Sequence, residues 1–242
     1  MGDVYLLEHG KPVLFNTPRA IICCQSFGAP DGRPLFHFHG QVSSRLEARF
    51  FERAAAEHGI RIIGMDRPGF GKSPPAAVQV RDWPAIIASL ADQMGFAQFG
   101  LQGVSAGVKY ALATVLEVPE RVTGVSLVSS FGPADDPALQ QAAARIRLSL
   151  ALYRRTPALG STVTTTTAFL LRHAARGFLR ATSVFIPKSE REMLAASDAF
   201  DTTADVLRAA ACQGPMGIDE EFRLLLAPWN LPLGEIRRPV TI

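Results

Sequence analysis

Short hydrophobic runs alternate along the chain with longer stretches in which hydrophobic residues recur every three or four positions. The short runs have the length and β-branched content of buried strands, and the longer stretches have the spacing of amphipathic helices. This alternation is typical of an α/β protein with a mostly parallel sheet, in which helices connect successive strands. Strands are predicted at residues 4–8, 19–25, 34–38, 60–65, 99–104, 122–129 and 238–242.

Helices are predicted between these strands and in a long segment of the second half. Residues 43–58 place Leu46, Phe50 and Ala54 on one face, with Ser43 or Ser44 as the N-cap. Further helices are predicted at 82–95, 106–116 and 220–227. From 133 to 217 the strand pattern disappears and an Ala-, Arg- and Thr-rich helical pattern replaces it. We therefore predict a core of residues 1–132 and 218–242, with an inserted helical cap at 133–217.

Composition supports one folded unit without metal or disulfides. The chain has 242 residues, 48% hydrophobic and 19% charged, with a formal net charge of +3, which gives no reason to expect a nucleic-acid partner. The three cysteines, Cys23, Cys24 and Cys212, are odd in number and lack metal-binding spacing, so we expect thiols in a reducing cytoplasm. The N-terminus does not resemble a signal peptide, and the longest uncharged stretch, 156–171, is too short to span a membrane.

A G-x-S-x-G pentapeptide, Gly103-Val104-Ser105-Ala106-Gly107, lies between a predicted strand and a predicted helix. In this setting it predicts a nucleophile elbow, a sharp and strained turn that projects the serine hydroxyl from the edge of the sheet. Glycines are needed on both sides because neighbouring segments pass too close for side chains. The following helix directs N–H groups and the positive end of its dipole at the site. The alternative is an ordinary strand–helix loop.

Two further motifs precede the elbow. Residues 36–41 read Phe-His-Phe-His-Gly-Gln and end a predicted strand, and residues 66–73 read Asp-Arg-Pro-Gly-Phe-Gly-Lys-Ser and follow the next strand. In the order and spacing of these three motifs, the chain resembles the α/β-hydrolase superfamily from about residue 4 to residue 242. The resemblance implies an α/β fold class, with a mostly parallel central sheet and an inserted helical cap.

The resemblance also implies roles for individual residues. Ser105 would be the nucleophile, and the backbone N–H groups of Gln41 and Ala106 would form the oxyanion hole, in which each donor lowers the barrier by roughly 3–4 kcal/mol. Serine stands where dehalogenases and epoxide hydrolases of the same fold carry aspartate, which points to acyl or ester chemistry. The supporting residues of the two loops would be His39, Gly40, Gly103 and Gly107.

Three polar features allow competing interpretations. Gly71-Lys72-Ser73 resembles the end of a phosphate-binding loop, but the first glycine of that motif would fall on Asp66 and no helix follows directly, so nucleotide binding is not predicted. His39 is interpreted as an anchor of the oxyanion loop, with a role as base as the alternative. Its neighbour His37 is interpreted as a hydrogen-bonded core histidine.

The acid and the histidine of a catalytic triad follow the serine in this fold. The resemblance places them after the seventh and eighth strands, and the seventh strand is predicted to begin at residue 238. We therefore expect the last strand and helix of the fold, and the acid/His end of the triad, to be absent from this chain. Only His173 follows Ser105, and it lies in the predicted cap. Asp135, beside Asp136, is a candidate acid or part of a polar loop.

These observations predict a serine hydrolase that acts on a small or medium ester through an acyl-enzyme at Ser105, with an apolar pocket under the cap and no cofactor or metal. Thioester, lactone or C–C bond hydrolysis are alternatives. A non-catalytic binding or interaction module, or a truncated inactive fragment, is the alternative of a different class. The expected partner is an ester-like small molecule, and an exposed sheet edge also predicts self-association.

Overall fold

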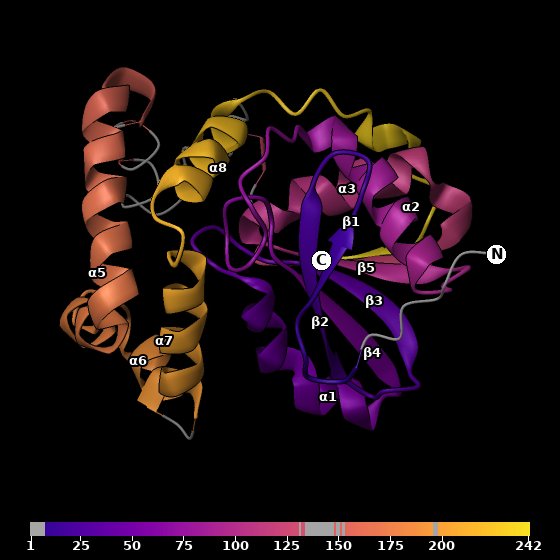
Figure 1. The fold of residues 1–242 in the computed structure, drawn as a ribbon, viewed down its shortest axis with the longest axis horizontal. Coiled ribbons are helices and arrows are strands. Elements are labelled where there is room, and N and C mark those ends of the chain that lie inside the picture. Colours follow the sequence, from indigo (N-terminus) through magenta and orange to yellow (C-terminus); the bar gives the residue numbers. More distant parts are fainter. Residues whose placement is uncertain (1–7, 131, 134–147, 149–150, 152, 196–197) are drawn as a thin grey trace.

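A seven-stranded sheet crosses the centre of the computed structural model, which describes residues 8–130, 132–133, 148, 151, 153–195 and 198–242 (Figure 1). The strands are β1 (Val13–Asn16), β2 (Ile21–Gly28), β3 (Arg33–Phe38), β4 (Ile60–Met65), β5 (Phe99–Val104), β6 (Val122–Val128) and β7 (Val240–Thr241). Their order across the sheet is β1-β2-β4-β3-β5-β6-β7. The β1–β2 and β2–β4 pairs are antiparallel and the other four pairs are parallel, which confirms the predicted sheet type.

The predicted strands agree with the structure everywhere except at the N-terminal end. The strand predicted at 4–8 lies outside the described residues apart from Glu8, which is not in a strand. The first strand of the structure is instead β1, which the hydrophobic pattern did not reveal because only four residues separate its flanking turns. Phe15 is its buried side chain, so a single inward residue carries the hydrophobic signal of this strand.

Side chains alternate between the two faces of the sheet, and helices cover both. Phe36 and Ile63 point to the face covered by α2 (Trp83–Gln93) and α3 (Val108–Glu117). Leu35 and Ile62 point to the opposite face, near the 3₁₀ helix η1 (Arg45–Phe51) and α1 (Glu52–Glu57). This arrangement places the N-terminus of α3, directly after β5, at the carboxyl edge of the parallel strands.

The segment predicted as a helix at 43–58 is helical from residue 45 to residue 57, but its first half, η1, is a 3₁₀ helix and only its second half, α1, is an α-helix. The Ser44 hydroxyl caps η1 by accepting the Leu46 N–H, as expected from the cap residues. The Asp66 carboxylate, at the end of β4, accepts both the backbone N–H and a guanidinium N–H of Arg45 at 2.8 Å. This tertiary anchor fixes the first turn of η1 and outweighs the α-helical periodicity.

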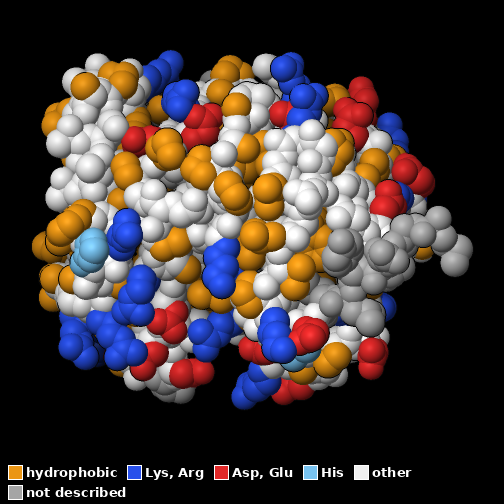
Figure 2. Space-filling model, viewed as in Figure 1, with side chains coloured by type: hydrophobic (Ala, Val, Ile, Leu, Met, Phe, Trp, Pro, Cys, Tyr) orange, Lys and Arg blue, Asp and Glu red, His pale blue; other side chains and the backbone are white. Residues whose placement is uncertain are grey.

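The described part of residues 153–226 is helical, as predicted. Its helices are α5 (Pro157–Ser183), α6 (Lys188–Ala195), α7 (Ala199–Ala210) and α8 (Met216–Leu226). Figure 1 shows α7 and α8 between the sheet and α5, and Figure 2 shows Lys and Arg side chains gathered over the lower part of this helical layer. α8 begins four residues before its predicted start at 220. No described helix is both long and apolar enough to cross a membrane.

Phe70 marks the place where the helical layer meets the sheet. It is 1% exposed and packs with Ala168, Leu171 and Ile218, which come from α5 and α8. The turn that carries Phe70 follows β4, so the helical layer rests on a turn at the carboxyl edge of the sheet. The division of the chain at residues 132/133 and 217/218 stays a prediction.

Candidate active site

Ser105 occupies a strained position between β5 and α3. Its φ is +49°, in the left-handed region, where a residue with a side chain costs roughly 1–2 kcal/mol. A 3₁₀ turn, η3 (Ser105–Gly107), joins the strand to α3, and Ser105 is half-buried. Backbone strain of this kind persists only where the surrounding structure enforces it, and it is frequent at functional sites.

The glycines of the pentapeptide are required by close backbone contacts. A Cβ added to Gly103 would lie 2.7 Å from the Val108 Cα atom. A Cβ added to Gly107 would overlap the carbonyl oxygen of Phe38. The helix therefore lies directly against both β5 and the end of β3, which is the local geometry that the sequence motif predicted.

The loop of residues 39–42 lies beside Ser105. A Cβ added to Gly40 would sit 3.6 Å from the Ser105 Cβ atom and 3.3 Å from Glu47 Oε1. Val42, in the same loop, has a φ of +50°, which is rare for a β-branched residue. The two strained residues, Ser105 and Val42, therefore belong to neighbouring loops at one edge of the sheet.

Two charged side chains hold this loop from opposite directions. Glu47 of η1 accepts the Gly40 N–H at 3.0 Å and the Ser43 hydroxyl at 2.8 Å. Arg67 donates from Nη1 to the His39 carbonyl oxygen and from Nη2 to the Gly40 carbonyl oxygen at 3.0 Å. The N–H and the carbonyl oxygen of Gly40 are thus both hydrogen-bonded to charged side chains.

The candidate oxyanion donors are the backbone N–H groups of Gln41 and Ala106. Among the described residues, no acceptor is hydrogen-bonded to the Gln41 N–H. Ala106 lies in the first turn of the helix, where N–H groups have no intrahelical acceptor. The Gln41 side-chain Nε2 atom is also buried without a partner in the described structure. The two backbone N–H groups are therefore the candidate donors for an incoming oxygen.

His39 and His37 are both buried and both hydrogen-bonded. His39 Nδ1 donates to the Gly40 carbonyl oxygen at 2.8 Å, and its Nε2 accepts the Arg67 N–H at 3.4 Å. Burial, together with the nearby Arg67 guanidinium, lowers the pKa of His39 well below its ordinary value, so the ring is neutral. His37 Nδ1 lies 2.7 Å from Gln102 Oε1, and its Nε2 lies 3.0 Å from Glu47 Oε2. These contacts favour the anchoring interpretation of both rings.

Arg67 also belongs to a buried charge cluster, Arg67–Glu221–Lys109–Tyr110. Glu221 Oε2 accepts from Arg67 Nε at 2.9 Å and from the Tyr110 hydroxyl at 2.9 Å. Lys109 Nζ lies 3.0 Å from Glu221 Oε1. Burial alone would raise the pKa of Glu221, but Arg67, Lys109 and Tyr110 outweigh it and hold that pKa below its ordinary value. The glutamate is therefore an anion that two cations share.

Apolar side chains border the serine on the side of α8. Leu225 and Phe222 of α8 pack against Ala106, the residue after Ser105. Val42 of the loop packs in the cluster of Phe70 and the helical layer. The surroundings of Ser105 thus combine free N–H donors with an apolar wall.

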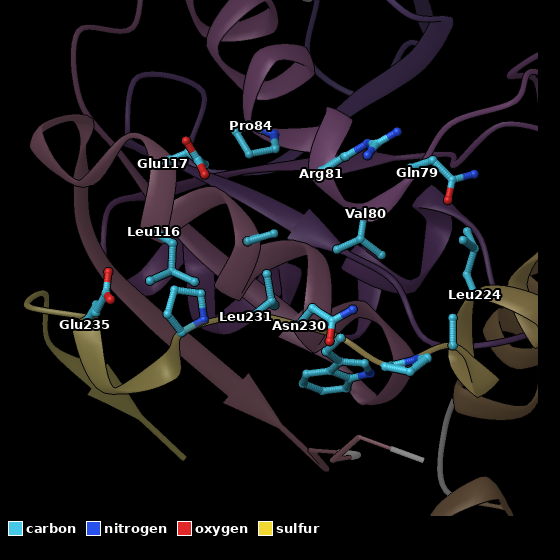
Figure 3. A pocket seen from close by; sticks show the side chains of 15 residues that line it. Gln79, Val80, Arg81, Pro84, Leu116, Glu117, Leu224, Asn230, Leu231 and Glu235 are labelled. Carbon is cyan, nitrogen blue, oxygen red and sulfur yellow. The ribbon is translucent and has the colours of Figure 1, made fainter. Parts of the chain in front are cut away.

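A separate cavity of about 510 Å³ lies between α2, α3 and the segment that follows α8 (Figure 3). Glu117 and Glu235 are at one end, and Gln79 and Arg81 are at the other. Its lining includes neither Ser105 nor the loop of residues 39–42, so it is distinct from the candidate active site.

The catalytic base and acid are not brought to Ser105 in the described structure. All five histidines are described, and none of them is hydrogen-bonded to Ser105. His173 is exposed on α5, where its ring lies 4.7 Å from that of Phe169. The candidate acid Asp135, and Asp136, lie outside the described residues.

Within the described part of the chain, no cluster of three or more His, Cys, Asp or Glu side chains could hold a metal ion. The three cysteines are free thiols. Burial raises the pKa of Cys23 to about 11 and that of Cys24 well above its ordinary value, so neither is a thiolate near neutral pH.

The structure adds support residues that sequence reasoning missed. Arg67 lies in a motif that the sequence singled out, but its contacts to the loop were not predicted. Glu47, Lys109 and Glu221 were not predicted as parts of the site. Lys109 carried a usable signal, because it is the one charge in α3 before the terminal Glu117, and a buried lysine requires a partner.

Comparisons with known proteins agree with this geometry. A family model described as the alpha/beta hydrolase fold matches residues 20–207. No curated protein sequence matches the chain significantly.

Solved structures are similar to this chain over nearly its whole length. A hydrolase from Pseudomonas aeruginosa has a TM-score of 0.64 and 19% identity, covering 96% of this chain and 78% of that chain. A thermophilic esterase from Thermogutta terrifontis has a TM-score of 0.61 and 17% identity, covering 95% and 78%. An alpha/beta hydrolase fold protein from Nakamurella multipartita has a TM-score of 0.59 and 21% identity, covering 95% and 79%. At these identities the similarity establishes the fold.

Proposed function

The chain belongs to the α/β-hydrolase fold family, and we propose that it is a serine hydrolase for small or medium esters with Ser105 as the nucleophile. Ser105 Oγ would attack the ester carbonyl carbon and lose its proton to a general base. The C–O bond to the alcohol would then break, leaving an acyl-enzyme at Ser105 and an alcohol that takes up the proton. Water would release the acid by the same steps in the second half of the reaction.

One observation carries the proposal. Ser105, with a φ of +49°, lies beside the loop of residues 39–42, in which the Gln41 N–H has no hydrogen-bond acceptor among the described residues. The N–H groups of Gln41 and Ala106 would receive the oxygen that becomes negatively charged in the tetrahedral intermediate. Each such donor accounts for roughly 10²–10³ in rate where it has been removed from a serine hydrolase. The strain at Ser105 supports the same conclusion, because backbone strain is frequent at functional sites.

The surroundings of Ser105 support an ester with an apolar part. Val42, Phe222 and Leu225 would contact the acyl or alcohol chain under the proposed cap of residues 133–217. The esterase from Thermogutta terrifontis, which has the same fold, supports this substrate class.

The chemical step requires a base that the described residues do not bring to Ser105. Without one, the hydroxyl keeps its ordinary pKa and is a weak nucleophile. This observation favours a second candidate function, a binding module that holds an ester or carboxylate at the N–H donors without cleaving it. The two functions differ in whether Ser105 becomes covalently modified.

Labelling with a fluorophosphonate probe tests the proposal. The probe should modify wild-type protein at Ser105, located by peptide mass spectrometry, and Ser105→Ala should abolish the signal. Ser129→Ala is the matched control, because Ser129 has the same φ of +49° and lies just beyond the next parallel strand, β6. Labelling that survives Ser105→Ala, or that is lost in Ser129→Ala, contradicts the assignment. Wild-type protein that binds the ester without any labelling favours the binding module.

A further inference from the structure

We propose that Arg67, held by Glu221 of α8, is the positioning residue of the oxyanion loop, so that the hole at Ser105 depends on the docking of α8. The inference rests on the proposed function only in naming residues 39–42 as the oxyanion loop. Neither Arg67 nor Glu221 would touch the substrate. They would act through the carbonyl groups of His39 and Gly40.

The first step of the argument is the geometry of the Arg67 guanidinium. Its Nη1 and Nη2 atoms donate to consecutive carbonyl oxygens, those of His39 and Gly40. Its backbone N–H donates to the His39 ring at 3.4 Å. Because the Gly40 carbonyl belongs to the peptide group that ends in the Gln41 N–H, fixing that oxygen also fixes the direction of the proposed oxyanion donor.

The second step is that Glu221 fixes the guanidinium itself. The Arg67 side chain is 4% exposed and that of Glu221 is 2% exposed, and their atoms meet at 2.9 Å. Arg67 Nε is the donor that faces away from the loop, so its bond to Glu221 orients the plane of the whole guanidinium. A planar guanidinium that makes several hydrogen bonds has a fixed orientation, which the rotatable ammonium group of a lysine would not have.

The third step is that Glu221 reaches Arg67 only because α8 lies against the turn that follows β4. A Cβ on Gly217 of α8 would lie 2.6 Å from the Gly69 carbonyl oxygen, so the two backbones are in direct contact. The Gln213 side chain, just before α8, donates to the carbonyl oxygens of Phe70, Gly71 and Ser73 at 2.8–3.2 Å. The connection from α7 to α8 therefore binds the same turn that carries Arg67.

A purely structural role for the ion pair would not require this arrangement. Asp66 of the same turn forms a comparable buried pair with Arg45 of η1 at 2.8 Å, and their side chains are 0% and 8% exposed. Arg45 donates to Gln25 and Asp66 and makes no contact with the loop carbonyls. Of these two buried arginine–carboxylate pairs in the described part of the chain, that of Arg67 is hydrogen-bonded to the loop carbonyls and that of Arg45 is not.

Hydrogen–deuterium exchange of the full chain compares these two pairs directly. Arg67→Lys and Glu221→Gln should each raise amide exchange in the peptide containing residues 39–42 by tenfold or more. The Glu221→Gln result is the sharper one, because that residue is on α8 and does not touch the loop. Arg45→Lys should destabilise the protein while leaving exchange of that peptide within twofold of wild type, after normalisation to peptides of α3.

Kinetics of fluorophosphonate labelling provide the functional readout. Arg67→Lys should lower the maximal labelling rate about 100-fold, similar to the loss of one oxyanion donor, with little change in the probe concentration for half-maximal rate. Tyr110→Phe removes one hydrogen bond to Glu221 but keeps the aromatic ring that lies 5.2 Å from the Arg67 guanidinium carbon, and its labelling should stay within tenfold of wild type.

The labelling and exchange experiments can fail independently, so they test the proposed function and the positioning role of Arg67 separately. If wild-type protein is not labelled, the hydrolase proposal fails and the exchange comparison alone decides the positioning role. Unchanged exchange of residues 39–42 in both Arg67→Lys and Glu221→Gln overturns the inference, as does equal loosening in Arg45→Lys. If Glu221→Gln fails to fold, Arg67→Lys, which keeps a cation opposite Glu221, decides it.

Discussion

The cluster of Arg67, Glu221 and Lys109 predicts that removal of its anion costs much more stability than removal of one of its cations. Its three side chains are at most 4% exposed, and they carry a net charge of +1. Glu221→Gln leaves two cations facing each other in the buried space. Lys109→Met leaves one cation paired with one anion, and it removes the cost of burying an ammonium group, a cost that lowers the pKa of Lys109.

The distances set the expected magnitude. At 2.9 Å and 3.0 Å, with an effective dielectric constant of about 20, each pair attracts by about 6 kcal/mol before the cost of desolvation. Breaking a buried pair by removing one partner typically costs about 3–5 kcal/mol, and we expect this loss for Glu221→Gln. We expect Lys109→Met to change the free energy of unfolding by about 1 kcal/mol or less, because Glu221 keeps Arg67 and Tyr110 as partners and is not left as an unpaired buried charge.

Urea denaturation at pH 7, followed by circular dichroism, measures both values. A loss of 3–5 kcal/mol is a large part of the roughly 5–15 kcal/mol that stabilises a domain, so Glu221→Gln should shift the midpoint clearly. The reasoning is refuted if Glu221→Gln lies within 1 kcal/mol of wild type, or if Lys109→Met costs as much as Glu221→Gln.

Four other predictions follow from the same structure. The pKa of Glu221 is lowered in the folded state. Its stabilising contribution is therefore complete above the ordinary glutamate pKa of about 4.3 and is lost as the pH falls through the folded value. In denaturation experiments at acid pH, the stability difference between wild type and Glu221→Gln should shrink from pH 5 toward pH 3. Ser105→Gly should be more stable than Ser105→Ala by about 0.5–1 kcal/mol in thermal unfolding, because only glycine relieves the left-handed strain; equal stability would argue against strain. Gly107→Ala should lower the free energy of unfolding in urea melts by about 3 kcal/mol, because the new Cβ would overlap the neighbouring backbone. Gly177→Ala, in an open position on α5, should raise it by about 0.5–1 kcal/mol. The short edge strand β7 exposes 38% of Val240, so self-association should appear in sedimentation velocity and decrease in Val240→Lys; a monomer at all concentrations contradicts it.

Much of the fold could be predicted from the sequence because its local signals agree with its tertiary environment. The parallel strands β3 to β6 are short buried runs, and the glycines around Ser105 mark backbone contacts that leave no room for a Cβ. β1 escaped prediction because it has one buried side chain. The 3₁₀ form of η1 was not predicted either, and Asp66 anchors its first residue, Arg45, from outside the segment. Local periodicity does not contain these tertiary contacts.

The candidate site shows the same limit. The motif residues Ser105 and Gln41 could be named from the sequence because a local turn places them. Glu221, which is 154 residues from its partner Arg67, could not, because only the docking of α8 brings the two together. Charges that look unremarkable one at a time therefore become informative only when their partners are known.

The backbone contact between Gly107 and the end of β3 has a consequence for anyone who wants to change the substrate range of this protein by directed evolution. The residues that shape the elbow and the loop touch one another through main-chain atoms, so a mutant library there would consist mostly of misfolded variants. Phe222 of α8 is different, because it is only partly buried and packs against Ala106 and the ring of Tyr153. Randomising position 222 while keeping Glu221 should give a library in which most members fold and in which the space beside the serine varies from one member to the next.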